Sequence, residues 1–213
     1  MNWDRFNKAI ELRENGSISA AVEILRSLLS EAQTKDEEAS IKSNIATAFA
    51  KLGDWNRAVT TIEETIRAAN PQNRDLGVTL EYLRSYYLLG LGGAQNALSA
   101  VRRIRLAYGD ILATPEHSEL STQCDSVEAF ALVHLGRFNE AIPLLSALLQ
   151  SSFSDQQEVA YYLAVSLASL GENTRSRELF MQASLGPDGA IAQKARENAA
   201  CLSDGAGGPP YNF

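Results

Sequence analysis

Apolar and polar positions recur five times along the chain, in the order apolar helix, glycine-containing turn and second amphipathic helix. The turns centre on Gly16, Gly53, Gly92, Gly136 and Gly171, which are 37, 39, 44 and 35 residues apart. About five positions after each glycine comes a small residue, followed four positions later by a large apolar one, so each set shares one helical face. These small residues are Ala21, Ala58, Ala97, Ala141 and Ser176. The periodicity predicts an all-α protein of stacked helix pairs, because one pair alone buries too little surface to be stable.

The second recurrence carries the most complete pattern, with apolar, small and aromatic positions in its first helix and Ala, then Ile, in its second. It comprises Ile45, Ala46, Phe49, Gly53, Trp55, Ala58, Ile62 and Pro71. In this order the chain resembles the tetratricopeptide repeat (TPR) family, whose unit is a 34-residue helix–turn–helix. The resemblance implies a right-handed α-solenoid, a superhelix of stacked antiparallel helix pairs.

The resemblance to the TPR family also predicts the domain organisation. We expect a single TPR solenoid domain over residues 1–203, then a flexible Gly/Pro-rich tail over 204–213. The repeats are expected at about 2–34, 35–71, 73–109, 115–151 and 155–187, with a capping helix at 188–203. The extra residues 109–118 before the fourth repeat predict a bend or a lengthened helix there. Pro143, early in a second helix, predicts at most a mild kink.

Composition narrows the classes of function. There are 19 basic against 26 acidic residues, and the net charge of −7 argues against binding along a nucleic-acid backbone. Two cysteines allow no disulfide framework or four-cysteine zinc site. Nowhere do 18 apolar residues run together, so we expect a cytoplasmic protein without direct membrane insertion.

Candidate catalytic or ligand-binding groups are sparse. His117, Cys124 and His134 are seven and ten residues apart, whereas a helical metal or nucleophile pair needs a spacing of three or four. The GLGG segment at 90–93 joins two helices and follows no strand, unlike a phosphate-binding loop. We therefore expect no catalytic residues, no metal, no cofactor and no enzymatic activity.

The TPR resemblance implies that the first helices of the repeats line a concave groove where partner peptides bind. The candidate partner-binding residues on this face are Asn7, Asn44, Tyr82, Tyr86, Phe130, His134, Tyr161 and Tyr162. The aromatic ones are in excess of the expected core positions, and Tyr and Phe suit recognition because they offer large contact areas with few rotors. Core packing is the alternative role for these aromatics.

One subtype of the family clamps the C-terminal carboxylate of a partner with Lys, Asn and Arg on its first helices. This chain keeps Asn7 and Asn44 but has Phe6, Ile10 and Leu83 at positions where clamp residues would lie, so the clamp is not expected. An apolar or amphipathic segment suits the groove better.

The resulting hypothesis is a non-enzymatic protein–protein interaction module, a scaffold, adaptor or assembly factor that binds a protein or peptide partner. Two alternatives stay open. One is a TPR chaperone for a secreted or membrane-associated client, and the other is a homo-oligomerising structural protein.

Overall fold

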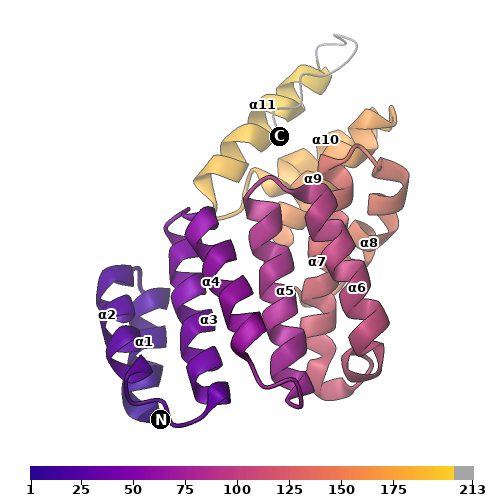
Figure 1. Cartoon of the computed structure of the whole chain (residues 1–213). Coiled ribbons are helices and arrows are strands. Elements are labelled where there is room, and N and C mark those ends of the chain that lie inside the picture. Colours follow the sequence, from indigo (N-terminus) through magenta and orange to yellow (C-terminus); the bar gives the residue numbers. More distant parts are fainter. Residues whose placement is uncertain (204–213) are drawn as a thin grey trace. The chain divides into compact units, whose positions relative to one another are not determined.

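The computed structural model describes residues 1–203, which form eleven α-helices and one 3-10 turn and contain no strand (Figure 1). The all-α fold class predicted from the sequence is confirmed. The chain divides into two compact units, one over residues 1–120 and one from Ser121 onward, and each is described by itself. The single domain over 1–203 stays a prediction, and the flexible tail predicted at 204–213 lies outside the described residues.

Unit 1 is three consecutive helix pairs. The pairs are α1 (Trp3–Glu14) with α2 (Ile18–Leu29), α3 (Lys35–Lys51) with α4 (Trp55–Ala68), and α5 (Arg74–Gly90) with α6 (Ala94–Leu112). Polar side chains start all three first helices and α4, because a side-chain oxygen accepts a backbone N–H that has no partner within the helix. The cap residues are Asn2, Thr34, Asp54 and Asn73.

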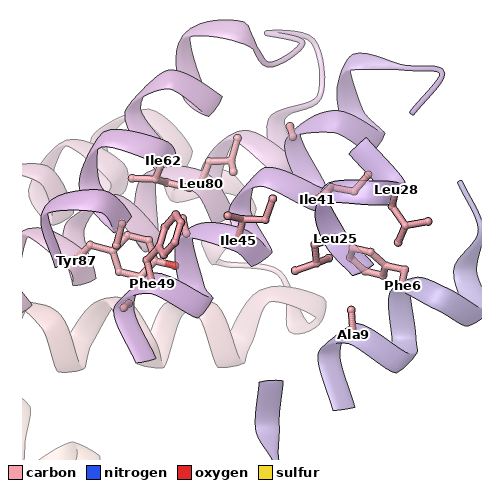
Figure 2. Packing of buried hydrophobic residues seen from close by; sticks show 14 residues of the cluster. Phe6, Ala9, Leu25, Leu28, Ile41, Ile45, Phe49, Ile62, Leu80 and Tyr87 are labelled. Carbon is pink, nitrogen blue, oxygen red and sulfur yellow. The ribbon is translucent and has the colours of Figure 1, made fainter. Parts of the chain in front are cut away.

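The core of unit 1 runs continuously through its helix pairs. Figure 2 shows this cluster, which takes side chains from α1 to α5. Ala9 and Ala58 are fully buried, and so small a side chain at these positions lets the two helices of a pair approach closely. Ile62 and Leu80 fill the space between neighbouring pairs, and both side chains are almost completely buried. The arrangement predicted for a TPR repeat is thus present in unit 1.

Unit 2 contains two further pairs and a last helix. They are α7 (Ser118–His134), which begins three residues before the boundary between the units, with α8 (Phe138–Gln150), then α9 (Gln156–Ser169) with α10 (Asn173–Ala183), and finally α11 (Gly189–Ser203). Ser176 takes the place of the usual alanine and is fully buried, where its hydroxyl donates to the carbonyl of Ala164 at 2.7 Å. That bond satisfies the one polar group that the substitution introduces. α8 remains one helix through the exposed Pro143.

The five predicted glycine turns all end their helices in the left-handed conformation. Gly16, Gly53, Gly92, Gly136 and Gly171 have φ between 69° and 85°, and no other described residue apart from them has positive φ. At Gly53 the backbone N–H donates to the carbonyl of Ala50, and that of Asp54 donates to Phe49, which closes the helix end. Only glycine adopts this conformation without a steric cost.

We expect Gly53→Ala to destabilise unit 1 by about 1–2 kcal/mol, because a Cβ strains a left-handed residue even though nothing lies within 4 Å of it. Gly109→Ala is the matched control. Gly109 lies in α6, has open space around its Cα and lacks positive φ, so alanine there should stabilise by about 0.5–1 kcal/mol. Urea denaturation of both variants measures the difference. Equal effects of the two substitutions would contradict the turn assignment.

The first part of the insertion before the fourth repeat lengthens α6, and the rest forms a short connection to α7. Tyr108, at φ −130° and ψ 18°, interrupts the helical geometry, after which the helix resumes to Leu112. A 3-10 turn, η1 (Pro115–His117), then leads to α7. The bend or lengthened helix expected at residues 109–118 is present, and its break falls at Tyr108.

Candidate functional site

An aromatic patch of unit 1 consists of Trp55 at the start of α4 and of Tyr82 and Tyr86 on α5. The rings of Tyr82 and Tyr86 stack with centroids 6.5 Å apart and planes 24° apart. Tyr86 meets the ring of Trp55 edge-on at 6.0 Å. The side chain of Tyr86 is 43% exposed, while Trp55 and Tyr82 are half-buried. The patch therefore offers aromatic surface to solvent on a rigid helical base.

The close approach of Trp55 to α5 depends on Gly90. A Cβ at Gly90 would lie 2.5 to 2.7 Å from three atoms of the Trp55 ring, which is well inside contact distance. The absence of a side chain at Gly90 therefore lets the indole lie against the end of α5. The GLGG segment thus has two structural roles. Gly90 makes room for the ring of Trp55, and Gly92 adopts the left-handed conformation of the turn.

Tyr87 anchors the patch from behind. Its side chain is fully buried, its ring contacts that of Tyr86 at 5.8 Å, and its hydroxyl pairs with the hydroxyl of Thr47 on α3 at 2.7 Å. Burial raises the pKa of Tyr87 to about 12, and the bond to Thr47 opposes that rise in part. Tyr87 is thus a core residue that ties α5 to α3.

A polar edge lies on α1 and α3 of the same unit. Arg13 donates from Nη1 to Oδ1 of Asn44 at 2.6 Å, and Asn44 donates to the carbonyl of Ser40. Glu14 pairs with Lys51 at 2.6 Å, and Lys51 and Arg13 hold the pKa of Glu14 below its usual value. Asn44 is therefore engaged by Arg13, whereas Asn7 is exposed on α1.

In unit 2 the structure brings four predicted site residues into one aromatic cluster on α7 and α9: Phe130, His134, Tyr161 and Tyr162. Phe130 and Tyr162 have ring centroids 4.7 Å apart, and Nε2 of His134 lies 3.2 Å from the hydroxyl of Tyr162. Burial raises the pKa of Tyr162, and the charge of Glu158 adds to the rise. Burial, with the positive charge of Lys194, lowers the pKa of His134 and so favours the neutral imidazole.

Packing accounts for part of this cluster. Phe130 is 7% and Tyr161 4% exposed. Tyr161 contacts the ring of Phe180 at 5.6 Å, and its hydroxyl accepts a hydrogen bond from Asn198 on α11 at 3.3 Å. These two aromatics support the cluster from within, so the surface of this cluster that solvent reaches is supplied by His134 and Tyr162.

The sequence pattern assigns Tyr82, Tyr86, Phe130 and Tyr162 to the groove face and pairs Tyr82 with Tyr86, but it does not predict the contact of Phe130 with Tyr162, nor a role for Trp55 or Arg13 at the site. The repeat pattern predicts Trp55 only as the aromatic position after the turn, and it predicts no role for Arg13. The available signal was the aromatic residue two positions after Gly53, which recurs as Phe138 after Gly136. Arg13 gave no periodic signal, because its partner Asn44 is 31 residues away.

The described residues hold neither a cluster of metal ligands nor a helix that could cross a membrane. Among residues 1–203, no group of three or more His, Cys, Asp or Glu side chains is arranged to hold a metal ion. None of the helices in this range has both the length and the apolar character that crossing a membrane requires.

The helix pairs of this chain are similar to repeats of a known family. Residues 128–190, from within α7 to the start of α11, match the family model for the tetratricopeptide repeat. No curated protein sequence matches the chain.

Three solved structures share the fold. YrrB, described as a TPR protein with an unusual peptide-binding site, aligns over 91% of this chain and 90% of its own at 18% identity, with a TM-score of 0.57. A putative kinesin light chain of Podosopora anserina with nearly identical TPR-like repeats aligns over 91% and 95% at 17% identity, with a TM-score of 0.60. MamA AMB-1 aligns over 95% and 99% at 20% identity, with a TM-score of 0.55.

These matches agree with what the two units show separately, namely antiparallel helix pairs closed by left-handed glycines and packed through small residues. The TPR resemblance stated from the sequence is confirmed. The family model thus covers residues 128–190, and the fold of the chain is similar to that of solved TPR proteins.

Proposed function

We propose that the chain is a non-enzymatic protein–protein interaction module, which binds an apolar or amphipathic peptide segment on the first-helix face of its repeats. The aromatic patch of unit 1 is the observation that carries this proposal. Trp55, Tyr82 and Tyr86 present stacked and edge-on rings, and the polar edge of the same unit contains Arg13 and Asn44. Partly exposed aromatics held rigidly are the side chains that most often dominate peptide recognition.

The composition of this surface favours an apolar segment with some polar groups over a carboxylate-clamped terminus. Phe6 and Ile10 on α1 are apolar, the first buried and the second half-buried. Neither therefore supplies the cation that a clamp requires. The YrrB description gives further support, since it assigns a peptide-binding site to a protein of the same fold. We place this activity in the cytoplasm, where a scaffold, adaptor or assembly factor would act.

Selection of peptides from a displayed random library on the full chain tests the proposal. We expect enrichment of sequences with two or more large apolar side chains at helical or extended spacing, without dependence on a free C-terminus. A library that yields no binders, or binders that need a terminal carboxylate, would contradict it. Light scattering at high protein concentration tests the alternative of self-association. We expect a monomer, whereas a homo-oligomerising protein would give a higher mass.

A further inference from the structure

A cavity of about 500 Å³ lies within unit 2, between the first turn of α9 and the connection from α10 to α11. Its volume falls in the range of sites that bind small ligands or single side chains. The lining residues are Ser154, Asp155, Gln156, Gln157, Glu158, Gln182, Leu185, Gly186, Pro187, Asp188 and Ile191. The aromatic cluster of α7 and α9 does not contribute to this lining.

Gln157 holds one wall of the cavity in place. Its Nε2 donates to the carbonyls of Ala183 and Asp188, both at 2.9 Å, and its Oε1 accepts the backbone N–H of Asp188 at 2.8 Å. A Cβ at Gly186 would lie 2.2 to 2.6 Å from atoms of the Gln157 side chain, so glycine is needed for this approach. The connection between α10 and α11 is therefore fastened to α9, and the cavity is preformed.

The lining is acidic, with three carboxylates from Asp155, Glu158 and Asp188 and no basic side chain. Asp188 already accepts the backbone N–H groups of Ala190 and Ile191 at the start of α11. In the described part of the chain, Glu158 has neither a hydrogen-bond nor an ion-pair partner. Its position among the other two carboxylates leaves negative charge in the cavity without a counter-charge.

The electrostatics of Glu158 agree with this geometry. Burial raises the pKa of Glu158 to about 7, and the charges of Asp155 and Asp188 add to the rise. The other titratable neighbour is Tyr162, one turn further along α9, whose own pKa Glu158 raises. A cation placed in the cavity would reverse this effect and favour the ionised carboxylate.

Apolar side chains complete the rim of the cavity. Leu185 is 87% exposed, and Pro187 and Ile191 lie on the same lining. A carboxylate pocket with apolar walls suits a long basic side chain, because the methylene stem packs on apolar atoms while the head pairs with the charge. Arginine fits better than lysine, since its planar fork can bond to two carboxylate oxygens at once.

We propose that this cavity binds the guanidinium group of an arginine in a partner peptide, with Glu158 as the pairing carboxylate and Leu185 as the contact for an adjacent apolar side chain. The site goes beyond the proposed function and uses none of the residues of the aromatic patch. The experiment below therefore tests this cavity independently of the library selection, which tests the aromatic patch.

The probe is the blocked dipeptide N-acetyl-arginyl-leucine amide, titrated into the full chain and followed by NMR shifts of the Ile191 methyl and of the Gln157 and Gln182 side-chain amides. We expect saturable binding at millimolar concentration, about five- to tenfold tighter at pH 8 than at pH 6, because Glu158 must ionise to pair with the cation. The citrulline analogue, which has the same shape without the charge, should bind at least fivefold more weakly at pH 8.

Glu158→Gln should lose at least fivefold in affinity at pH 8 and most of the pH dependence. Glu178→Gln is the matched control, because it removes the same charge from an exposed position on α10 outside the cavity lining. It should bind as the wild type does. Equal binding by the wild type and Glu158→Gln, equal binding of the citrulline analogue, or no binding at about 10 mM probe would each overturn the proposal.

Discussion

Replacing Ile62 by alanine is expected to lower the free energy of unfolding of unit 1 by about 2–5 kcal/mol. Ile62 is 0% exposed on α4 and belongs to the cluster that runs from Phe6 and Leu25 to Leu80 and Tyr87 (Figure 2). The substitution removes three carbon atoms from a site that neighbours on several helices surround. Since those helices are already packed against one another, we expect a residual cavity.

The continuous core explains why the effect should extend beyond the second repeat. In a repeat protein each unit is stabilised mainly by its neighbours, so a cavity in the middle pair weakens the interfaces on both sides. The chain has two tryptophans, Trp3 and Trp55, and both lie in unit 1. Their fluorescence during urea denaturation therefore reports on this unit.

Ile62→Val is the control for the size of the change, with an expected loss of about 0.5–1.5 kcal/mol. Both variants should keep the helical circular dichroism of the wild type at low denaturant. A loss below about 1 kcal/mol for Ile62→Ala would show that the middle pair is not the packed centre of unit 1.

Glu158→Gln is expected to stabilise unit 2 at neutral and alkaline pH by up to about 3 kcal/mol. In the folded chain the pKa of Glu158 is about 7, against 4.5 for an unperturbed carboxyl. A carboxyl with a raised pKa contributes full stability below pH 4.5 and loses it as the pH rises through 7. The free energy of unfolding of the wild type should therefore fall between about pH 4.5 and 8. The variant should not show this loss, because glutamine does not ionise.

The measurement is amide hydrogen exchange of α9 and α10 in both proteins, at pH 5 and pH 8 after correction for intrinsic rates. We expect the variant to be more protected by less than about 1 kcal/mol at pH 5 and by clearly more at pH 8. Glu178→Gln, at an exposed position, should lie within about 0.5 kcal/mol of the wild type at both values. A variant less stable than the wild type at pH 8 would mean that the Glu158 carboxylate is favourably paired.

Much of the fold was predictable because its determinants are local. A left-handed glycine, a small residue five positions later and apolar residues at helical spacing recur in each repeat, and each has one structural reason. Ser176 departs from the alanine pattern without disturbing it, since its hydroxyl finds the carbonyl of Ala164. The break at Tyr108 was less predictable, because residues 109–118 fit either a bend or a longer helix.

The sites were predictable only in part, because they depend on contacts between residues far apart in sequence. Four-residue spacing was enough to pair Tyr82 with Tyr86 on α5. The indole of Trp55 joins them through its approach to Gly90, and Tyr161 is covered by Asn198 of α11, 37 residues later. The cavity beside Glu158 is formed by two stretches of the chain, residues 154–158 and 182–191, and no periodic pattern links them.

The central claim is that the aromatic patch of unit 1 binds the partner, and the most direct test is the affinity of one library-selected peptide for three proteins. These are the wild type, the Tyr82→Ala/Tyr86→Ala double variant, and Leu106→Ala, which removes an 88% exposed apolar side chain from α6 in the same unit. Circular dichroism confirms that each is folded. We predict at least a tenfold loss for the double variant and no change for Leu106→Ala. Equal affinity of all three proteins would contradict the account.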